Sequence, residues 1–138
     1  MILVSACLLG ENCKYSGGNN ENAAVRRWLQ GREYLAVCPE LLGGLAAPRP
    51  PAERQGERIV NAQGGDDTAA FLAGAQKTLE LCQQHNIRAA LLKEGSPSCG
   101  VHQIYDGSFC HRRIPRQGVT AELLAAHGVA LLSEEDLV

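Results

Sequence analysis

Three cysteines occupy turns that follow short apolar segments of the chain. Cys99 belongs to residues 95–100, Gly-Ser-Pro-Ser-Cys-Gly, where proline and glycine favour a turn. Cys7 and Cys38 stand in the same relation to apolar segments of their own. Cysteine is often simply buried, but thiolates are also the side chains that bind iron and zinc. We expect these three residues to form one site.

The residue pattern alone leaves the type of site open. Structural zinc takes cysteines in close pairs, and the nearest pair here is Cys7 and Cys13, with no C-x-x-C motif. Cysteines on separate turns suit an iron–sulfur cluster, in which three thiolates leave one iron open as a Lewis acid. Cys13 could be a fourth ligand, a reactive thiol or a spectator. The alternatives are a zinc-stabilised binding module without enzymatic activity, and a thiol or persulfide sulfur-transfer enzyme with Cys13 as nucleophile.

Polar residues in the same turns fit a reaction site. Glu40 lies two residues after Cys38 and is a candidate general base or acid, although it could also be a solvated loop carboxylate. Ser96 and Ser98 precede Cys99 and could donate hydrogen bonds to a substrate or stabilise the turn. Arg49 could bind an anionic group or pair with a carboxylate of the domain itself.

Hydrophobic periodicity predicts the elements that position these residues. The predicted strands cover 2–6, 34–37, 87–92 and 129–132, and helices are predicted after Asn19 or Asn20, over 69–84 and over 121–126. This order indicates a three-layer α/β domain with a mainly parallel four-stranded sheet. Because ligands bind at the carboxyl ends of parallel strands, the three cysteines should meet at that edge.

Local signals add expectations about element ends and packing. Asn19 or Asn20 should cap the first helix and Thr120 the last. Leu72 and Cys82 fall on the apolar face of the helix over 69–84, so both should be buried. The remaining expectations are a loop at 41–56, a short edge strand or hairpin at 57–61, a hairpin turn at 106–107 and an incidental thiol at Cys110.

Composition limits the function classes. The chain has 138 residues, 45% of them apolar and 20% charged, which suits one globular domain over 1–138. A net charge of −2 and few aromatic residues argue against nucleic-acid or membrane-surface binding. The amino terminus lacks a basic n-region, so we expect a cytoplasmic protein. In that reducing compartment, cysteines in turns are more often ligands or catalytic groups than disulfides.

Several short motifs, in order along nearly the whole chain, resemble those of one family. They are Ser-Ala-Cys-Leu-Leu-Gly at 5–10, Cys-Pro-Glu at 38–40, Gly-Gly-Leu at 43–45, Ser-Pro-Ser-Cys-Gly at 96–100 and Ile-Tyr-Asp-Gly at 104–107. Together they resemble the thiouracil desulfidase family, a group of small bacterial iron–sulfur domains.

The resemblance implies a Rossmann-like fold and an oxygen-sensitive [4Fe-4S] cluster held by three cysteines, which by motif are Cys7, Cys38 and Cys99. It also implies a non-redox reaction in which the open iron binds the sulfur of a thiolated pyrimidine. For 2-thiouracil, water attacks C2 and the products are uracil and sulfide. Other thiolated bases or nucleosides fit the same motifs.

The resemblance also suggests roles for the remaining site residues. A carboxylate and a serine assist the reaction in this family. By motif, Glu40 is the expected general base, and Ser98 or Ser96 the expected hydrogen-bond donor to the substrate. Cys13 matches a motif cysteine outside the three-ligand set, so its expected role is catalytic or supporting.

Overall fold

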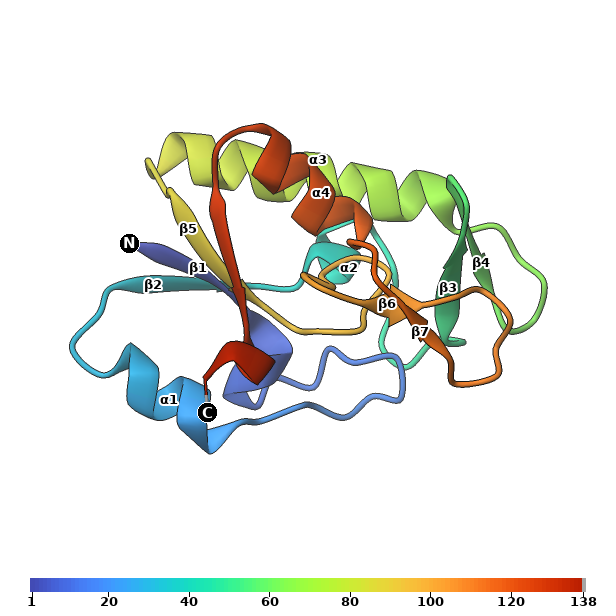
Figure 1. The fold of residues 1–138 in the computed structure, drawn as a ribbon, viewed down its shortest axis with the longest axis horizontal. Coiled ribbons are helices and arrows are strands. Elements are labelled where there is room, and N and C mark those ends of the chain that lie inside the picture. The colour runs from blue at the N-terminus through green and yellow to red at the C-terminus, as the bar shows by residue number, and fades with distance from the viewer. Residues whose placement is uncertain (138) are drawn as a thin grey trace.

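The computed structural model describes residues 1–137 and has a parallel four-stranded sheet at its centre (Figure 1). In spatial order the strands are β2 (Tyr34–Val37), β1 (Ile2–Ser5), β5 (Ala89–Leu92) and β8 (Ala130–Ser133). All three neighbouring pairs are parallel. The predicted fold class, an α/β domain with a mainly parallel four-stranded sheet, is confirmed. The chain moves outward from β1 in one direction and from β5 in the other, so the strand order switches between them.

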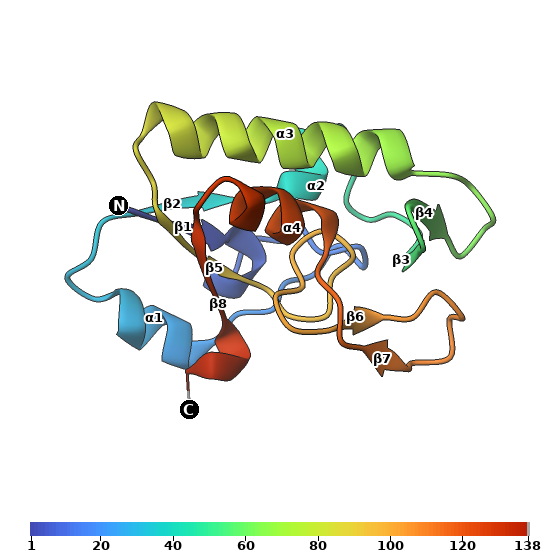
Figure 2. The ribbon, with the colours of Figure 1, turned by 45° about the horizontal axis from the view of Figure 1, so that its top comes forward.

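Helices cover both faces of this sheet, which makes three layers (Figure 2). The helices are α1 (Ala23–Leu29), α2 (Pro39–Leu42), α3 (Thr68–Gln84) and α4 (Val119–Ala126). Successive side chains of β1 point to opposite faces, as in any strand. Leu3 therefore packs with Leu79 of α3 and Leu124 of α4, whereas Val4 packs with Val25 of α1.

Two small hairpins lie beyond the carboxyl edge of the sheet (Figure 1). One pairs β3 (Ala52–Gln55) with β4 (Arg58–Asn61), and the other pairs β6 (Ile104–Tyr105) with β7 (Arg113–Ile114). The first hairpin is anchored by Ile59, which packs with Phe71 of α3 in a small separate core. Two 3₁₀ turns, η1 (Ala6–Leu9) and η2 (Glu134–Asp136), follow β1 and β8.

One element prediction is wrong, a predicted hairpin has a longer loop than expected, and one burial prediction is wrong. The expected loop at 41–56 contains the end of α2 and all of β3, because β3 forms by pairing with β4 and not through any hydrophobic alternation of its own. The predicted hairpin near 106–107 exists, but its second strand lies at 113–114, after a longer loop. Leu72 of α3 is 51% exposed, since that side of the helix faces solvent.

Both predicted helix caps are wrong as well. Asn22, and neither Asn19 nor Asn20, caps α1 by accepting a hydrogen bond from the Val25 N–H. Gly118 precedes α4, and Thr120 lies inside that helix with its hydroxyl buried. Which residue caps a helix depends on where the chain turns into that helix. Here tertiary contacts determine the position of the turn.

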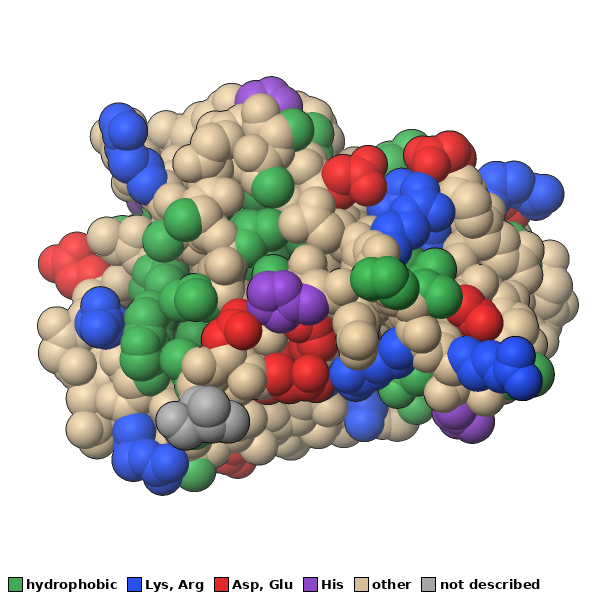
Figure 3. All heavy atoms as spheres, in the orientation of Figure 1, with side chains coloured by type: hydrophobic (Ala, Val, Ile, Leu, Met, Phe, Trp, Pro, Cys, Tyr) green, Lys and Arg blue, Asp and Glu red, His purple; other side chains and the backbone are tan. Residues whose placement is uncertain are grey.

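The surface is mixed in charge. On the face shown in Figure 3, basic side chains are distributed among acidic and uncharged ones, and acidic groups lie along the lower side of a histidine near its middle. No helix within residues 1–137 is long and apolar enough to cross a membrane.

Candidate functional site

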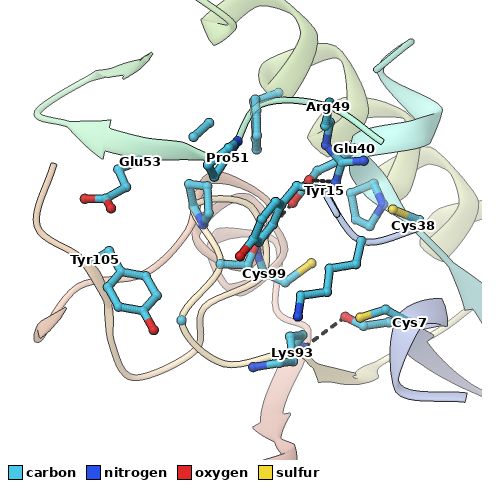
Figure 4. Close-up of a pocket in the computed structure, with 18 of the residues that line it drawn as sticks. Cys7, Tyr15, Cys38, Glu40, Arg49, Pro51, Glu53, Lys93, Cys99 and Tyr105 are labelled. Carbon is cyan, nitrogen blue, oxygen red and sulfur yellow. Dashed lines mark hydrogen bonds and ion pairs between the residues drawn. The ribbon is translucent and has the colours of Figure 1, made fainter. Parts of the chain in front are cut away.

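A cavity of about 550 Å³ opens at the carboxyl edge of the sheet, next to the switch between β1 and β5. Cys7, Cys13, Cys38 and Cys99 all line it. Figure 4 shows the sulfurs of Cys7, Cys38 and Cys99 facing a common space from three separate turns. The structure thus brings together the three cysteines that the sequence placed at strand ends, and adds Cys13.

Each of the three thiols is held by the element that follows its strand. Cys7 lies in η1, directly after β1. Cys38 is the residue before α2, whose first position is Pro39, and a proline is well suited to start a helix there. Cys99 lies in the turn after β5, closed by a hydrogen bond of 2.9 Å from the Gly100 N–H to the Ser96 carbonyl.

The position of α2 depends on two glycines that let it approach α3 closely. A Cβ on Gly74 of α3 would lie 1.9 Å from the Pro39 carbonyl oxygen, and a Cβ on Gly43 would lie 2.0 Å from the Ala70 carbonyl oxygen. Neither position has room for a side chain. Because α2 also carries Glu40, this contact places both a thiol and a carboxylate at the cavity.

Cys13 interacts with two of the other thiols. Its hydrogen bonds lower the pKa of Cys7 and, together with burial, the same contacts raise the pKa of Cys13. A hydrogen bond from Cys13 likewise lowers the pKa of Cys38, to about 7. The Cys13 thiol, with its raised pKa, is thus the protonated member of this group, whereas a thiolate nucleophile would require a lowered pKa of its own. Burial raises the pKa of Cys99, which is only 4% exposed.

The spacing of these groups is not that of a site for one metal ion. Within residues 1–137, no three histidine, cysteine or acidic side chains are close enough to bind a single ion. A cuboidal iron–sulfur cluster is larger and takes its thiolates at separate corners. Three thiols facing one space from different turns fit such a cluster.

Glu40 lies beside these thiols and is held by two neighbours. Arg49 forms an ion pair with one carboxylate oxygen, and the Ser96 hydroxyl donates to the other over 3.2 Å. The Ser96 oxygen accepts hydrogen bonds from the Ser98 and Cys99 N–H groups, both 3.0 Å long. With its lone pairs used in this way, the hydroxyl proton points at Glu40.

Ser98 has different surroundings. Its hydroxyl is buried and lies 2.7 Å from the Thr120 hydroxyl in α4, and Ser98 is not among the residues that line the cavity. Of the two serines singled out in the sequence, only Ser96 has its hydroxyl beside the cavity carboxylate.

The two remaining cysteines, Cys82 and Cys110, lie outside the cavity. Cys82 is buried in the core between α3 and the sheet, as predicted, and its burial raises its pKa. Cys110 is exposed and does not line the cavity.

Several cavity residues were not predicted to be at the site, although Tyr105 lies in one of the family motifs and Asn20 was a candidate helix cap. Asn20 contacts Cys7, while Tyr105 and Glu53 come from the two hairpins and border the far end of the cavity (Figure 4). Each comes from a loop or a short strand without hydrophobic periodicity. Arg49 was expected to bind an anionic group or to pair with a carboxylate of the domain itself, and the structure shows the second, with Glu40 as the partner.

The fold and the cavity define an α/β domain that presents converging thiols and a carboxylate at the carboxyl edge of its sheet. Residues 2–136 match the family model described as 2-thiouracil desulfurase, so the chain belongs to that family. This match confirms the resemblance seen in the short motifs.

The chain is also similar to a curated protein and to a solved structure. The chain is 42% identical to the YbbK protein of Bacillus subtilis (strain 168), over 99% of this chain and 97% of that protein. It is also similar to a solved structure described as the [4Fe-4S]-dependent thiouracil desulfidase TudS. That similarity has a TM-score of 0.92 and 49% identity, and it covers 99% of this chain and 91% of the other.

Proposed function

We propose that this protein is an enzyme that removes sulfur from a thiolated pyrimidine, converting 2-thiouracil and water into uracil and hydrogen sulfide. Membership of the 2-thiouracil desulfurase family and the similarity to a thiouracil desulfidase support this activity. The observation that carries it to particular residues is the convergence of three strand-end thiols and Glu40 on one cavity.

The cofactor in this proposal is a [4Fe-4S] cluster with Cys7, Cys38 and Cys99 as ligands. The donor set fits the group, because the three thiols face one space and belong to three separate turns. When bound, such a cluster supplies a Lewis-acidic iron that three thiolates leave open, and this polarises the carbon–sulfur bond. Cys13 is not a ligand in this assignment: its single S–H proton can be donated to the Cys7 or the Cys38 sulfur, and its contacts lower the pKa of both.

Glu40 is the general base of the proposed reaction. It takes a proton from the water that attacks the pyrimidine carbon. Arg49 compensates the carboxylate charge, and the Ser96 hydroxyl fixes the direction in which the carboxylate faces. The backbone of Arg49 is also tied to the Cys13–Tyr15 loop through its N–H, 2.7 Å from the Tyr15 carbonyl. The segments that carry Arg49, Ser96 and Tyr15 are thereby joined around the Glu40 carboxylate.

The deciding experiment is chemical analysis of anaerobically prepared protein, followed by incubation with 2-thiouracil. We expect a brown protein with about four iron atoms and matching acid-labile sulfide per chain, and formation of uracil detected by chromatography. Cys7→Ser, Cys38→Ser and Cys99→Ser should each lose the cluster, while Cys110→Ser serves as the matched control and keeps it.

Two results would overturn the proposal. One is a colourless protein with stoichiometric zinc after anaerobic reconstitution with iron and sulfide. The other is a fully loaded protein that leaves 2-thiouracil and other thiolated pyrimidines unchanged.

A further inference from the structure

Asn20 holds Cys7 by two hydrogen bonds. Its side-chain Nδ2 donates to the Cys7 sulfur over 3.4 Å, and its backbone N–H donates to the Cys7 carbonyl over 2.9 Å. Asn20 itself lines the cavity. No helix or strand contains Asn20, and the α1 cap is Asn22, so local secondary structure does not account for the contact with sulfur.

The loop that carries Asn20 is anchored on both sides of this contact. The chain leaves η1 at Gly10 and returns to it, where the Asn22 N–H donates to the Leu8 carbonyl over 3.0 Å. The backbone N–H groups of Asn20 and Asn22 thus both donate to η1, and the Asn20 side chain lies between these two hydrogen bonds. Because the backbone is tied down in this way, the loop itself fixes the position of the amide at the sulfur.

We propose that Asn20 is a positioning residue that donates an N–H···S hydrogen bond to the Cys7 thiolate and thereby sets the electron density of the proposed cluster. This inference rests on the proposed function. An N–H donor stabilises negative charge on sulfur, and hydrogen bonds to the sulfurs are among the factors that set the potential of iron–sulfur clusters. Removing the donor should make the cluster harder to reduce.

Cys13 lowers the pKa of both Cys7 and Cys38, and the two thiols differ in their further donors. The Leu41 N–H of α2 donates to Cys38 and contributes to its lowered pKa, behind the larger effect of Cys13. That donor is a backbone group and cannot be removed by a simple substitution. The amide of Asn20 is a side chain, so its contribution can be tested without changing the backbone.

The test compares Asn20→Ala with Asn19→Ala in anaerobically loaded protein. Asn19 is the matched control, since its amide donates to Asn12 on an exposed part of the same loop. The readout is the midpoint potential from a titration followed by electron paramagnetic resonance. We expect Asn20→Ala to make reduction about tenfold less favourable, equivalent to about 59 mV for a one-electron couple. Iron release to a chelator should also be faster, and Asn19→Ala should match the wild type.

A second variant keeps the inference testable if Asn20→Ala fails to fold. Asn20→Asp has nearly the same size but places an acceptor near the sulfur, so it should lower the potential at least as far. Loaded Asn20 variants with the potential and iron-release rate of the wild type would overturn the role of Asn20 alone. A wild-type protein that takes up no cluster would instead overturn the proposed function.

Discussion

At the scale of single residues, the site is organised around Glu40, whose two carboxylate oxygens have different partners. Arg49 neutralises the charge on one side, and Ser96 donates to the other. The carboxylate is thus oriented at the cavity wall beside the thiols. A general base needs this arrangement, because it must present a lone pair to a proton in a fixed direction.

Glu40→Gln should retain the cluster and lose turnover. A glutamine keeps the size of the side chain but cannot accept a proton, so we expect kcat to fall about 10²- to 10⁴-fold. Iron content and initial rates of uracil formation measure the two effects separately. Glu11→Gln, an exposed residue outside the cavity, is the control and should behave as the wild type. Full activity of Glu40→Gln would assign the base to another residue.

Replacing Ser96 and Ser98 by alanine, one at a time, should have different effects on turnover and on stability. Ser96→Ala removes the hydroxyl beside Glu40, and we expect a loss of turnover of about tenfold or more, since the carboxylate is no longer oriented. Ser98→Ala leaves the buried Thr120 hydroxyl unpaired, which should cost about 1–3 kcal/mol of unfolding free energy with little change in kcat. Urea unfolding and initial rates distinguish the effects. The reverse outcome, with Ser98→Ala inactive and Ser96→Ala active, would exchange their roles.

At the scale of secondary structure, the site depends on elements that must approach one another closely. The helix α2 positions Cys38 and Glu40 together, and it rests on α3 through glycines. The turn after β5 carries Cys99 and is continued by a segment held by Glu94. That carboxylate accepts hydrogen bonds from the Val101, His102 and Gln103 N–H groups, 2.8 to 3.0 Å long.

Gly74→Ala should destabilise the protein, although alanine is normally the better helix former. In an exposed helix the change would stabilise by about 1 kcal/mol. Here the added methyl group would clash with the Pro39 carbonyl, and we expect a loss of about 1–3 kcal/mol. Ala73→Gly, at the exposed neighbouring position, is the control and should cost only the helix propensity, about 1 kcal/mol. An increase in unfolding free energy for Gly74→Ala would show that α2 can move away freely.

Glu94→Gln should destabilise the protein in a pH-dependent way. Burial alone would raise the pKa of Glu94, but the Gln103 and His102 N–H groups, the Ser133 side chain and the Val101 N–H hold that pKa below its ordinary value. A carboxyl group with a lowered folded-state pKa stabilises above its unfolded pKa, near 4.3, and this contribution disappears as the pH falls through the folded value.

Urea unfolding between pH 3 and pH 7 measures this difference. The gap between wild type and Glu94→Gln should be largest near neutral pH, about 1.5–3 kcal/mol, and should narrow below about pH 4.5. A gap that is independent of pH would mean that the Glu94 charge does not contribute. Glu80→Gln, on the exposed side of α3, is a suitable control with no expected pH-dependent gap.

At the scale of the whole molecule, the sheet is a frame from which loops of separate origin reach one cavity. The hairpins β3–β4 and β6–β7 border that cavity at one end, and η1, α2 and the turn after β5 border it at the other. The two hairpins are also tied together, because Glu53 accepts hydrogen bonds from the Gly107 and Phe109 N–H groups, 3.0 and 3.1 Å long.

Residues 1–138 are predicted to form a single domain, and unfolding tests this. Trp28 in α1 packs on one face of the sheet, while α3 supplies much of the helical signal on the other. Tryptophan fluorescence and far-ultraviolet circular dichroism should therefore report one transition with the same urea midpoint. Two separated midpoints would show that the layers unfold independently.

The sequence by itself determined the four strands of the central sheet, the long helix, the parallel strand directions and the convergence of Cys7, Cys38 and Cys99. Hydrophobic periodicity is a local property, and parallel strands necessarily bring their carboxyl ends to one edge. Short motifs such as Cys-Pro-Glu at 38–40 also indicated the family, because such motifs can be recognised in the sequence without knowledge of the fold.

Only the tertiary structure decided which groups form hydrogen bonds or ion pairs with the cavity thiols and with the Glu40 carboxylate. Ser96 and not Ser98 faces Glu40, Arg49 pairs with that carboxylate, and Asn20 returns to Cys7 instead of capping a helix. These contacts join residues from loops that lack periodicity. Their geometry depends on how closely neighbouring elements pack, and no local pattern of residue types contains that information.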